Sequence, residues 1–220
     1  MSRTDAAKLN IVKYTLAAAI GAQANEHDRV ELWIPTFNCG NTLDWLHWKQ
    51  KFNELVIMKN WSTGPVLFLN TRILLKGEAK DAFELAVNGM NQTVANHTLA
   101  MAEVAAESLD ENPRETLMTM IREKRKDQNT TVKKFVKHLR ELSVLVTLLP
   151  AGNNEPIGND TLLFNIKRGM PEAWRRSYDA SGQRLQTISA LSQYFCRQEK
   201  NNPIVEKKIM QRKQQQPKEE

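Results

Sequence analysis

The feature that most constrains the fold of this chain is an aromatic segment that begins near Asn41. Trp45, Trp48 and Phe52 recur there at intervals of three and four residues, so a helix places the three rings on one face. Asn41 or Thr42 can cap the start of that helix. Because one helix cannot bury so many rings alone, the segment predicts a core helix inside a larger helical domain and not a ligand site.

The rest of the chain favours helices over sheets. Of the 220 residues 41% are apolar and 25% charged, which is enough to build a core, and only 9 are glycine. We expect an all-α fold of roughly nine or ten helices in two small lobes, with an extended lead-in at 30–37. The expected segments are an N-terminal helix (3–24) and linker within 1–29, a first lobe at 30–127, a second lobe at 128–200, and a basic polar tail, expected to be disordered, at 201–220.

A second strongly periodic segment runs from residue 132 to residue 149. Its apolar residues follow the i, i+3, i+4, i+7 pattern of a helix with one buried face, and Pro150 follows its end. This segment predicts the central helix of the second lobe. The residues expected to form the structural core of the two lobes are Trp45, Trp48, Phe52, Trp61, Phe135, Leu139 and Leu142.

Motifs of catalysis and metal binding are absent from the sequence. The four histidines are scattered and stand in no ligand spacing, and there is no Gly-rich phosphate loop and no nucleophile elbow. We therefore expect a non-enzyme with no catalytic residues, cofactor, metal or small-molecule substrate. Cys39 and Cys196 are too far apart to suggest a disulfide framework, which favours a reducing cytoplasmic setting. No apolar run reaches the length of a membrane span, so no membrane partner is expected.

The charges are separated into two blocks. Residues 81–113 contain six acidic residues and no Lys or Arg, whereas residues 114–140 contain nine Lys or Arg against three acidic residues. Such blocks favour surfaces that attract each other, within one molecule or between copies, or weak non-specific contact with RNA. The candidate RNA or subunit contacts are Arg122, Lys124, Arg125, Lys126, Lys133, Lys134, Lys137 and Arg140.

The order of these motifs resembles the capsid region of LTR-retrotransposon Gag proteins, and most closely the gypsy-type, retrovirus-like capsids. The resemblance covers about residues 33–200 and includes an aromatic lead-in followed by Trp-x-x-Trp-x-x-x-Phe at Trp45 to Phe52. It continues with a Leu-x-Gly-x-Ala segment at 75–79 and with Gly-Met-Pro at 169–171. The Cys-His box that binds RNA in many Gag proteins does not occur in these residues.

The resemblance implies a structural Gag protein with retroviral capsid-like N-terminal and C-terminal lobes. Such a protein would self-assemble as a homo-oligomer into virus-like particles that enclose element RNA in the cytoplasm. Two other functions fit the same residues. One is a domesticated, capsid-like module that binds partner peptides in an apolar groove near Trp33 and Phe37. The other is a non-catalytic helical RNA-binding protein that forms no shell.

Overall fold

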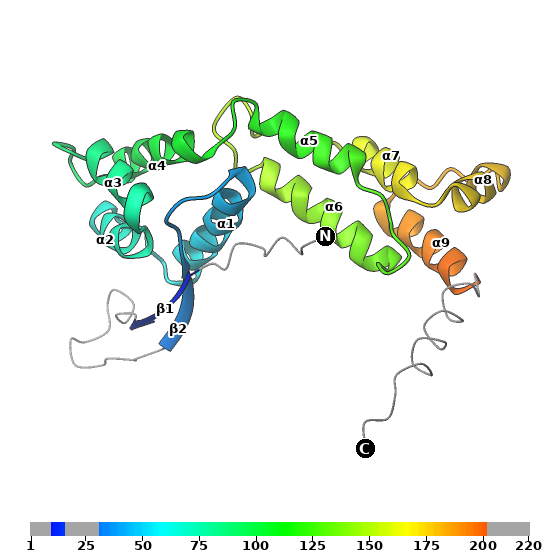
Figure 1. The fold of residues 1–220 in the computed structure, drawn as a ribbon, viewed down its shortest axis with the longest axis horizontal. Helices are drawn as coiled ribbons and strands as arrows, with labels where there is room; N and C mark the ends of the chain where they lie inside the picture. Colours follow the sequence, from blue (N-terminus) through cyan, green and yellow to red (C-terminus); the bar gives the residue numbers. More distant parts are fainter. Residues whose placement is uncertain (1–9, 16–30, 202–220) are drawn as a thin grey trace, which may run out of the picture. The chain divides into compact units, whose positions relative to one another are not determined.

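The computed structural model of the chain describes residues 10–15 and 31–201, and they form a β-hairpin followed by nine helices (Figure 1). Strand β1 (Asn10–Thr15) pairs with β2 (Glu31–Thr36) in antiparallel register. The helical character expected from the sequence is confirmed. The helices are α1 (Thr42–Met58), α2 (Gly64–Leu74), α3 (Gly77–Ala86), α4 (Val94–Ser108), α5 (Pro113–Glu123), α6 (Val132–Val146), α7 (Asn159–Gly169), α8 (Glu172–Ala180) and α9 (Ile188–Lys200).

The helix predicted at 3–24 is wrong in its described part, because residues 10–15 form a strand. Their sequence, Asn-Ile-Val-Lys-Tyr-Thr, is rich in β-branched and aromatic residues, which suit a strand once a partner is available. The partner is the lead-in expected to be extended, and Pro35 pairs with Ile11 at the edge of this two-stranded sheet. The remainder of the expected N-terminal helix, and the expected tail beyond Asn201, lie outside the described residues.

Helix α1 begins with a capping box. The Asn41 side chain accepts hydrogen bonds from the backbone N–H groups of Leu43 and Asp44, and the Asp44 carboxylate accepts one from Asn41 N at 3.2 Å. Two otherwise unsatisfied donors at the helix start are thereby paired, so Asn41 rather than Thr42 is the cap. The hydroxyl of Thr42 instead accepts a hydrogen bond from Asp110 N at 2.9 Å, which ties the end of α4 to the start of α1.

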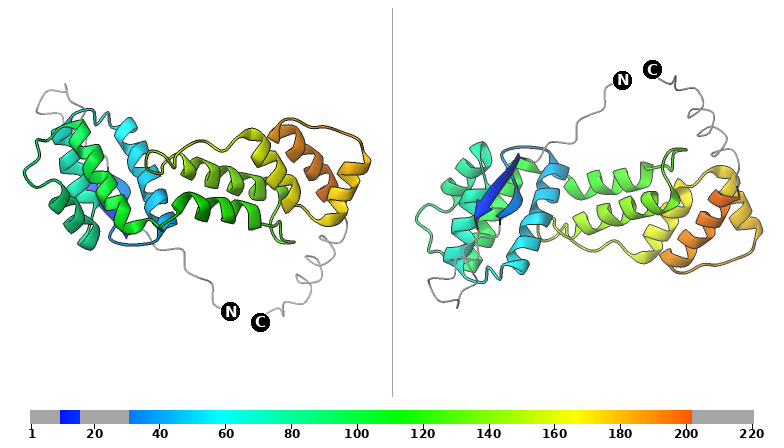
Figure 2. Two further views of the ribbon diagram at one scale, coloured as in Figure 1. Left: turned by 90° about the horizontal axis from the view of Figure 1, so that it is seen from above. Right: turned by 90° about the horizontal axis from the view of Figure 1, so that it is seen from below.

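The aromatic residues of α1 form the core of the first part of the chain. The ring centroids of Trp45 and Trp48 lie 5.2 Å apart, and Phe37 lies 5.2 Å from Trp45. Trp48 Nε1 donates a hydrogen bond to the Pro35 carbonyl at 3.1 Å, which satisfies the indole and ties the end of β2 to α1. Strand β2 accordingly lies beside α1 and α2. Figure 2 shows the strands among the helices of this part of the chain. All seven expected core residues are buried.

The chain divides into two compact units, one with residues 1–113 and 148–153 and the other with residues 114–147 and 154–220. The division falls at Pro113 and Arg114, whereas the sequence suggested a boundary after Asp127. Helix α5 therefore belongs to the second unit. Backbone and side-chain contacts hold both of its flanks there, since Arg114 donates to the Glu155 carbonyl at 2.7 Å and Lys126 N donates to the Gly169 carbonyl at 2.8 Å.

The second unit is centred on the apolar face of α6, where Phe135, Leu139 and Leu142 are buried. Helix α7 ends against this face at Gly169. A Cβ atom there would lie 2.3 Å from Phe135 Cζ and 3.0 Å from the Lys124 carbonyl oxygen, so only glycine fits without displacement. This close approach explains the glycine in the Gly-Met-Pro segment in purely structural terms.

Candidate functional site

The basic residues at the end of α5 and directly after it are mostly engaged in local contacts. Arg122 Nη1 lies 2.7 Å from a Glu115 carboxylate oxygen, and Arg125 donates hydrogen bonds to the carbonyls of Arg122 and Lys124. Both guanidinium groups stay near the surface but are held by their own segment. Lys124 is exposed. This part of the predicted basic surface is therefore a set of paired or isolated charges and not a continuous binding face.

The prediction that Lys126 is a surface contact for RNA or another subunit is wrong. Its side chain is only 4% exposed, and its ammonium lies 3.1 Å from a Glu199 carboxylate oxygen and 5.0 Å from the centre of the Trp174 ring. Glu199 also accepts hydrogen bonds from Val132 N at the first residue of α6. The cluster joins the segment after α5 to α6, α8 and α9. Lys126 is thus a structural cation of the second unit, because its charge is buried and paired.

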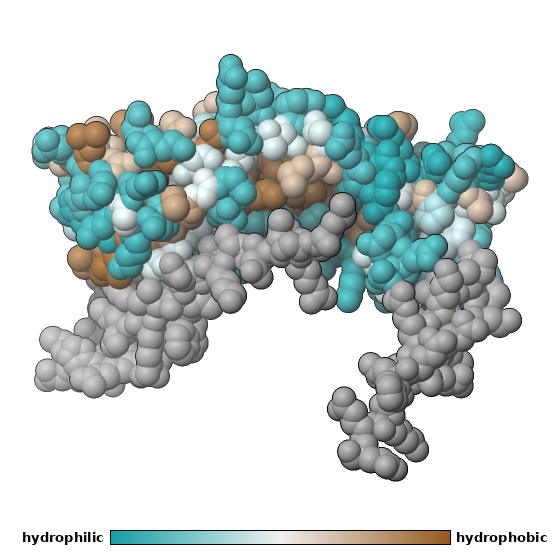
Figure 3. Space-filling view, in the orientation of Figure 1, coloured by the Kyte–Doolittle hydropathy of each residue, from teal (hydrophilic) through white to brown (hydrophobic). Residues whose placement is uncertain are grey.

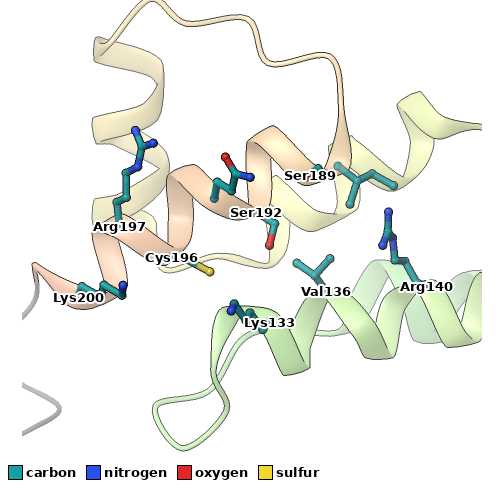
Figure 4. A pocket seen from close by; sticks show the side chains of 10 residues that line it. Lys133, Val136, Arg140, Ser189, Ser192, Cys196, Arg197 and Lys200 are labelled. Carbon is teal, nitrogen blue, oxygen red and sulfur yellow. The ribbon is translucent and has the colours of Figure 1, made fainter.

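Two cations of α6 and two of α9 line a basic groove of about 490 Å3. Lys133 and Arg140 contribute from α6, and Arg197 and Lys200 contribute from α9 (Figure 4). The contact of Val132 with Glu199 places the start of α6 at the end of α9. The other lining residues are Val136, Ile188, Ser189, Ser192, Gln193 and Cys196.

Hydrogen-bond donors dominate the lining of the basic groove. Its ammonium, guanidinium, hydroxyl and amide groups can bind carboxylate or phosphate oxygens. None of the four cations has an ion-pair partner within the part of the chain that the structure describes. The half-buried Cys196 is a free thiol. The lining of the groove therefore suits an anionic ligand better than acid–base catalysis, since it contains no carboxylate and no histidine.

The groove contains two predicted contacts and two that the sequence did not suggest. Lys133 and Arg140 line it, whereas Lys134 and Lys137 are exposed outside it and Lys137 lies 3.6 Å from a Glu141 carboxylate. The sequence did not predict Arg197 and Lys200 as contacts, because only the tertiary packing of α9 on α6 brings them beside Lys133. Their three-residue spacing at the end of a helix was the available signal.

A second hollow, of about 630 Å3, lies within the same unit between α7, α8 and the start of α9. Its rim carries Phe164, whose side chain is 62% exposed, and its lining includes Leu163, Leu185 and Leu191. Lys167 and Asp179 form an ion pair at the same hollow. A singly exposed apolar residue is common on protein surfaces, but a ring beside a hollow with apolar lining has the shape to contact another protein.

The first unit contains a buried histidine with a structural role. Burial, together with the positive charge of Lys49, lowers the pKa of His97 to about 4. Burial also lowers the pKa of Lys49 to about 8. The His97 Nε2 and Thr71 Oγ1 atoms lie 2.7 Å apart, and the rings of Phe52, Phe68 and Phe83 surround the imidazole. His97 is therefore neutral at pH 7 and links α4 to α2.

Phe37, which one of the sequence hypotheses placed in a peptide-binding groove, is also part of this core. Its ring is 2% exposed and contacts Trp45 and Trp48. Its backbone N–H donates to Leu74 and its carbonyl accepts from Lys76, so the residue is held on both sides. An apolar groove at Phe37 would require opening the core of the first unit.

Comparisons with known proteins identify no relative: no protein-family model, no curated protein and no solved structure matches the chain. Within residues 10–15 and 31–201 no cluster of three or more His, Cys, Asp or Glu side chains is arranged to bind a metal ion. None of the helices in that part of the chain combines the length and the apolar character needed to span a bilayer.

Proposed function

We propose that this chain is a structural capsid protein of the LTR-retrotransposon Gag type, whose copies self-assemble into a shell around element RNA in the cytoplasm. The ordered motifs of residues 33–200 support this proposal, as does a helical chain arranged in two compact units. Shell assembly requires rigid units that repeat weak contacts, and a closed lattice multiplies the effect of each contact. It requires no catalytic residue.

The observation that carries the proposal is the exposed Phe164 on α7. Leaving this ring in water forgoes about 1.5–3 kcal/mol that its burial would contribute. If two copies meet around a two-fold axis, each ring can enter the hollow beside Leu163 and Leu185 of the other copy. Other exposed apolar residues on the first unit offer further contact points: Ile57, Met58, Leu69, Leu85 and Leu99. Figure 3 shows hydrophobic areas at the surface of the face that it draws, among hydrophilic residues.

Electron microscopy and sedimentation velocity of the purified protein, across salt and protein concentration, test the proposal. We expect concentration-dependent oligomers or particles for the wild-type chain, and a clear loss of them for Phe164→Ala. Val144→Ala is the matched control, since Val144 is 46% exposed on α6 of the same unit and does not line the hollow. A chain that stays monomeric at every concentration and salt refutes the proposal, whereas assembly that Phe164→Ala leaves unchanged refutes only the α7 contact.

A helical RNA-binding protein without a shell is the second candidate, and the basic groove favours it. Binding to phosphates alone depends steeply on salt, because each neutralised phosphate releases counterions. RNA affinity that falls with salt, together with a strictly monomeric protein, would support this candidate. Charge reversal at Lys133, Lys134 and Lys137 would then abolish RNA binding, and unchanged RNA binding by that variant would exclude a site on α6.

A further inference from the structure

The four cations of the basic groove form no ion pair with acidic residues in the described part of the chain. Lys133 lies in the first turn of α6, which contains no acidic residue, so its ammonium faces the positive end of the helix dipole. That placement costs a few tenths of a kcal/mol or about 1 kcal/mol at most. The Glu199 carboxylate at the end of α9 is engaged with Lys126 and with the Val132 amide. The charge on Lys133 therefore does not stabilise α6.

The end of α4 carries the opposite imbalance. Glu103 and Glu107 are exposed on its last turns, which contain no basic residue, and Asp110 and Glu111 follow directly. These four side chains, called here the acidic end, lie at the negative end of the helix dipole and lack an ion-pair partner among the residues that the structure describes. The hydrogen bond from Asp110 N to Thr42 holds this segment in a defined position.

We propose that the acidic end of one copy docks in the basic groove of a second copy. The inference rests on the proposed self-assembly and specifies one of its contacts. Glu103 and Glu107 are one helical turn apart, about 6 Å, and Lys133 and Arg140 are two turns apart, about 10.5 Å. Two carboxylates on one helix face therefore fit along the groove between cations from α6 and from α9 (Figure 4). Since the two surfaces differ, the contact is head-to-tail and can propagate through a lattice.

Charge complementarity favours a second copy over RNA as the occupant. The groove is lined by no aromatic residue, so it cannot stack bases and could hold RNA only through phosphates. RNA would explain the groove but would leave the acidic end without a partner. Docking between copies neutralises both surfaces at once, and it accounts for a stretch from residue 81 to residue 113 that contains no Lys or Arg.

Two charge-reversal variants of the full chain test the docking. The α4 variant carries Glu103→Lys and Glu107→Lys, and the groove variant carries Lys133→Glu and Arg197→Glu. In each variant alone, reversing two of the four charges cancels the net charge of one surface and places like charges opposite each other, so we expect self-association at low salt to weaken by about a hundredfold. In an equimolar mixture the unaltered acidic end of the groove variant can meet the unaltered groove of the α4 variant, so the mixture should associate again. Sedimentation velocity at 50 mM and 300 mM salt measures all three samples.

A control variant with Lys134→Glu and Lys137→Glu has the same net charge as the groove variant but leaves the groove intact. We expect its self-association to stay close to that of the wild type.

Association that occurs in the mixture but in neither single variant supports docking between copies. If single variants and mixture all associate normally, the docking is wrong although self-assembly stands. If the mixture stays dissociated, or if the groove variant loses only binding to a single-stranded RNA oligonucleotide, the groove serves another occupant and the inference is overturned. If the wild-type chain itself never associates, the proposed function fails as well.

Discussion

Replacing Glu199 by Gln should destabilise the second unit, because it removes the carboxylate that pairs with the buried Lys126. The substitution keeps an oxygen that can accept the Val132 N–H but removes the charge that pairs with Lys126 at 3.1 Å. At that separation two unit charges attract by about 5 kcal/mol when the effective dielectric constant is about 20. The variant leaves the Lys126 ammonium, which is only 4% exposed, without its carboxylate, but the ammonium keeps its hydrogen bond to the Asp127 carbonyl, so the expected net loss is about 2–3 kcal/mol.

Urea unfolding followed by circular dichroism, with hydrogen exchange of the α6 and α9 amides, measures this loss. Lys126→Met keeps the packing of the side-chain stem and leaves Glu199 free to hydrate, so it should cost only about 1 kcal/mol. Combining both substitutions should cost clearly less than the sum of the two. The exposed pair Lys137–Glu141 provides the control, where Glu141→Gln should change stability by less than about 0.5 kcal/mol. If Glu199→Gln behaves like this control, Lys126 is not a buried, paired cation.

Two further changes test the cores of the two units. The pKa of His97 is about 4 in the folded chain and about 6.5 in an unfolded one, so only the unfolded chain takes up its proton as the pH falls between these values. The contribution of His97 to the free energy of unfolding should be complete above pH 6.5 and should fall by up to about 3 kcal/mol by pH 4. Urea unfolding at pH 7 and pH 5 gives the loss of free energy between these pH values, and this loss should be about 2 kcal/mol larger for the wild type than for His97→Gln. Equal pH dependence in the two proteins would show that His97 is not buried in its neutral form. Gly169→Ala should cost about 1–3 kcal/mol because its Cβ would collide with Phe135, and a thermal midpoint equal to that of the exposed Gly158→Ala control would contradict this close approach.

Local sequence patterns were sufficient to predict most helices and the buried residues. The three-and-four spacing of Trp45, Trp48 and Phe52 places these rings on one face of any helix, and such a face is buried wherever a partner is found. The same holds for Phe135, Leu139 and Leu142 on α6. The strand at 10–15 was missed because a strand requires a partner, and its partner is separated from it by the segment 16–30.

The candidate site depended on contacts between segments that are distant in sequence. Lys126 and Lys133 are seven residues apart and chemically alike, yet one is buried against Glu199 and Trp174 while the other lines an open groove. Charge counting cannot separate them, because burial is decided by what packs against each side chain.

By itself, therefore, the sequence determined a helical chain, the aromatic and aliphatic faces of its helices, and the separation of acidic from basic residues. The tertiary structure decided which charges became structural and which remained available, since α9 packs antiparallel to α6 and brings Arg197 and Lys200 beside Lys133. It also decided that α5 belongs to the second unit. The physical reason is the same in each case: helix periodicity is a local property, whereas burial and ion pairing are set by residues that only folding brings together.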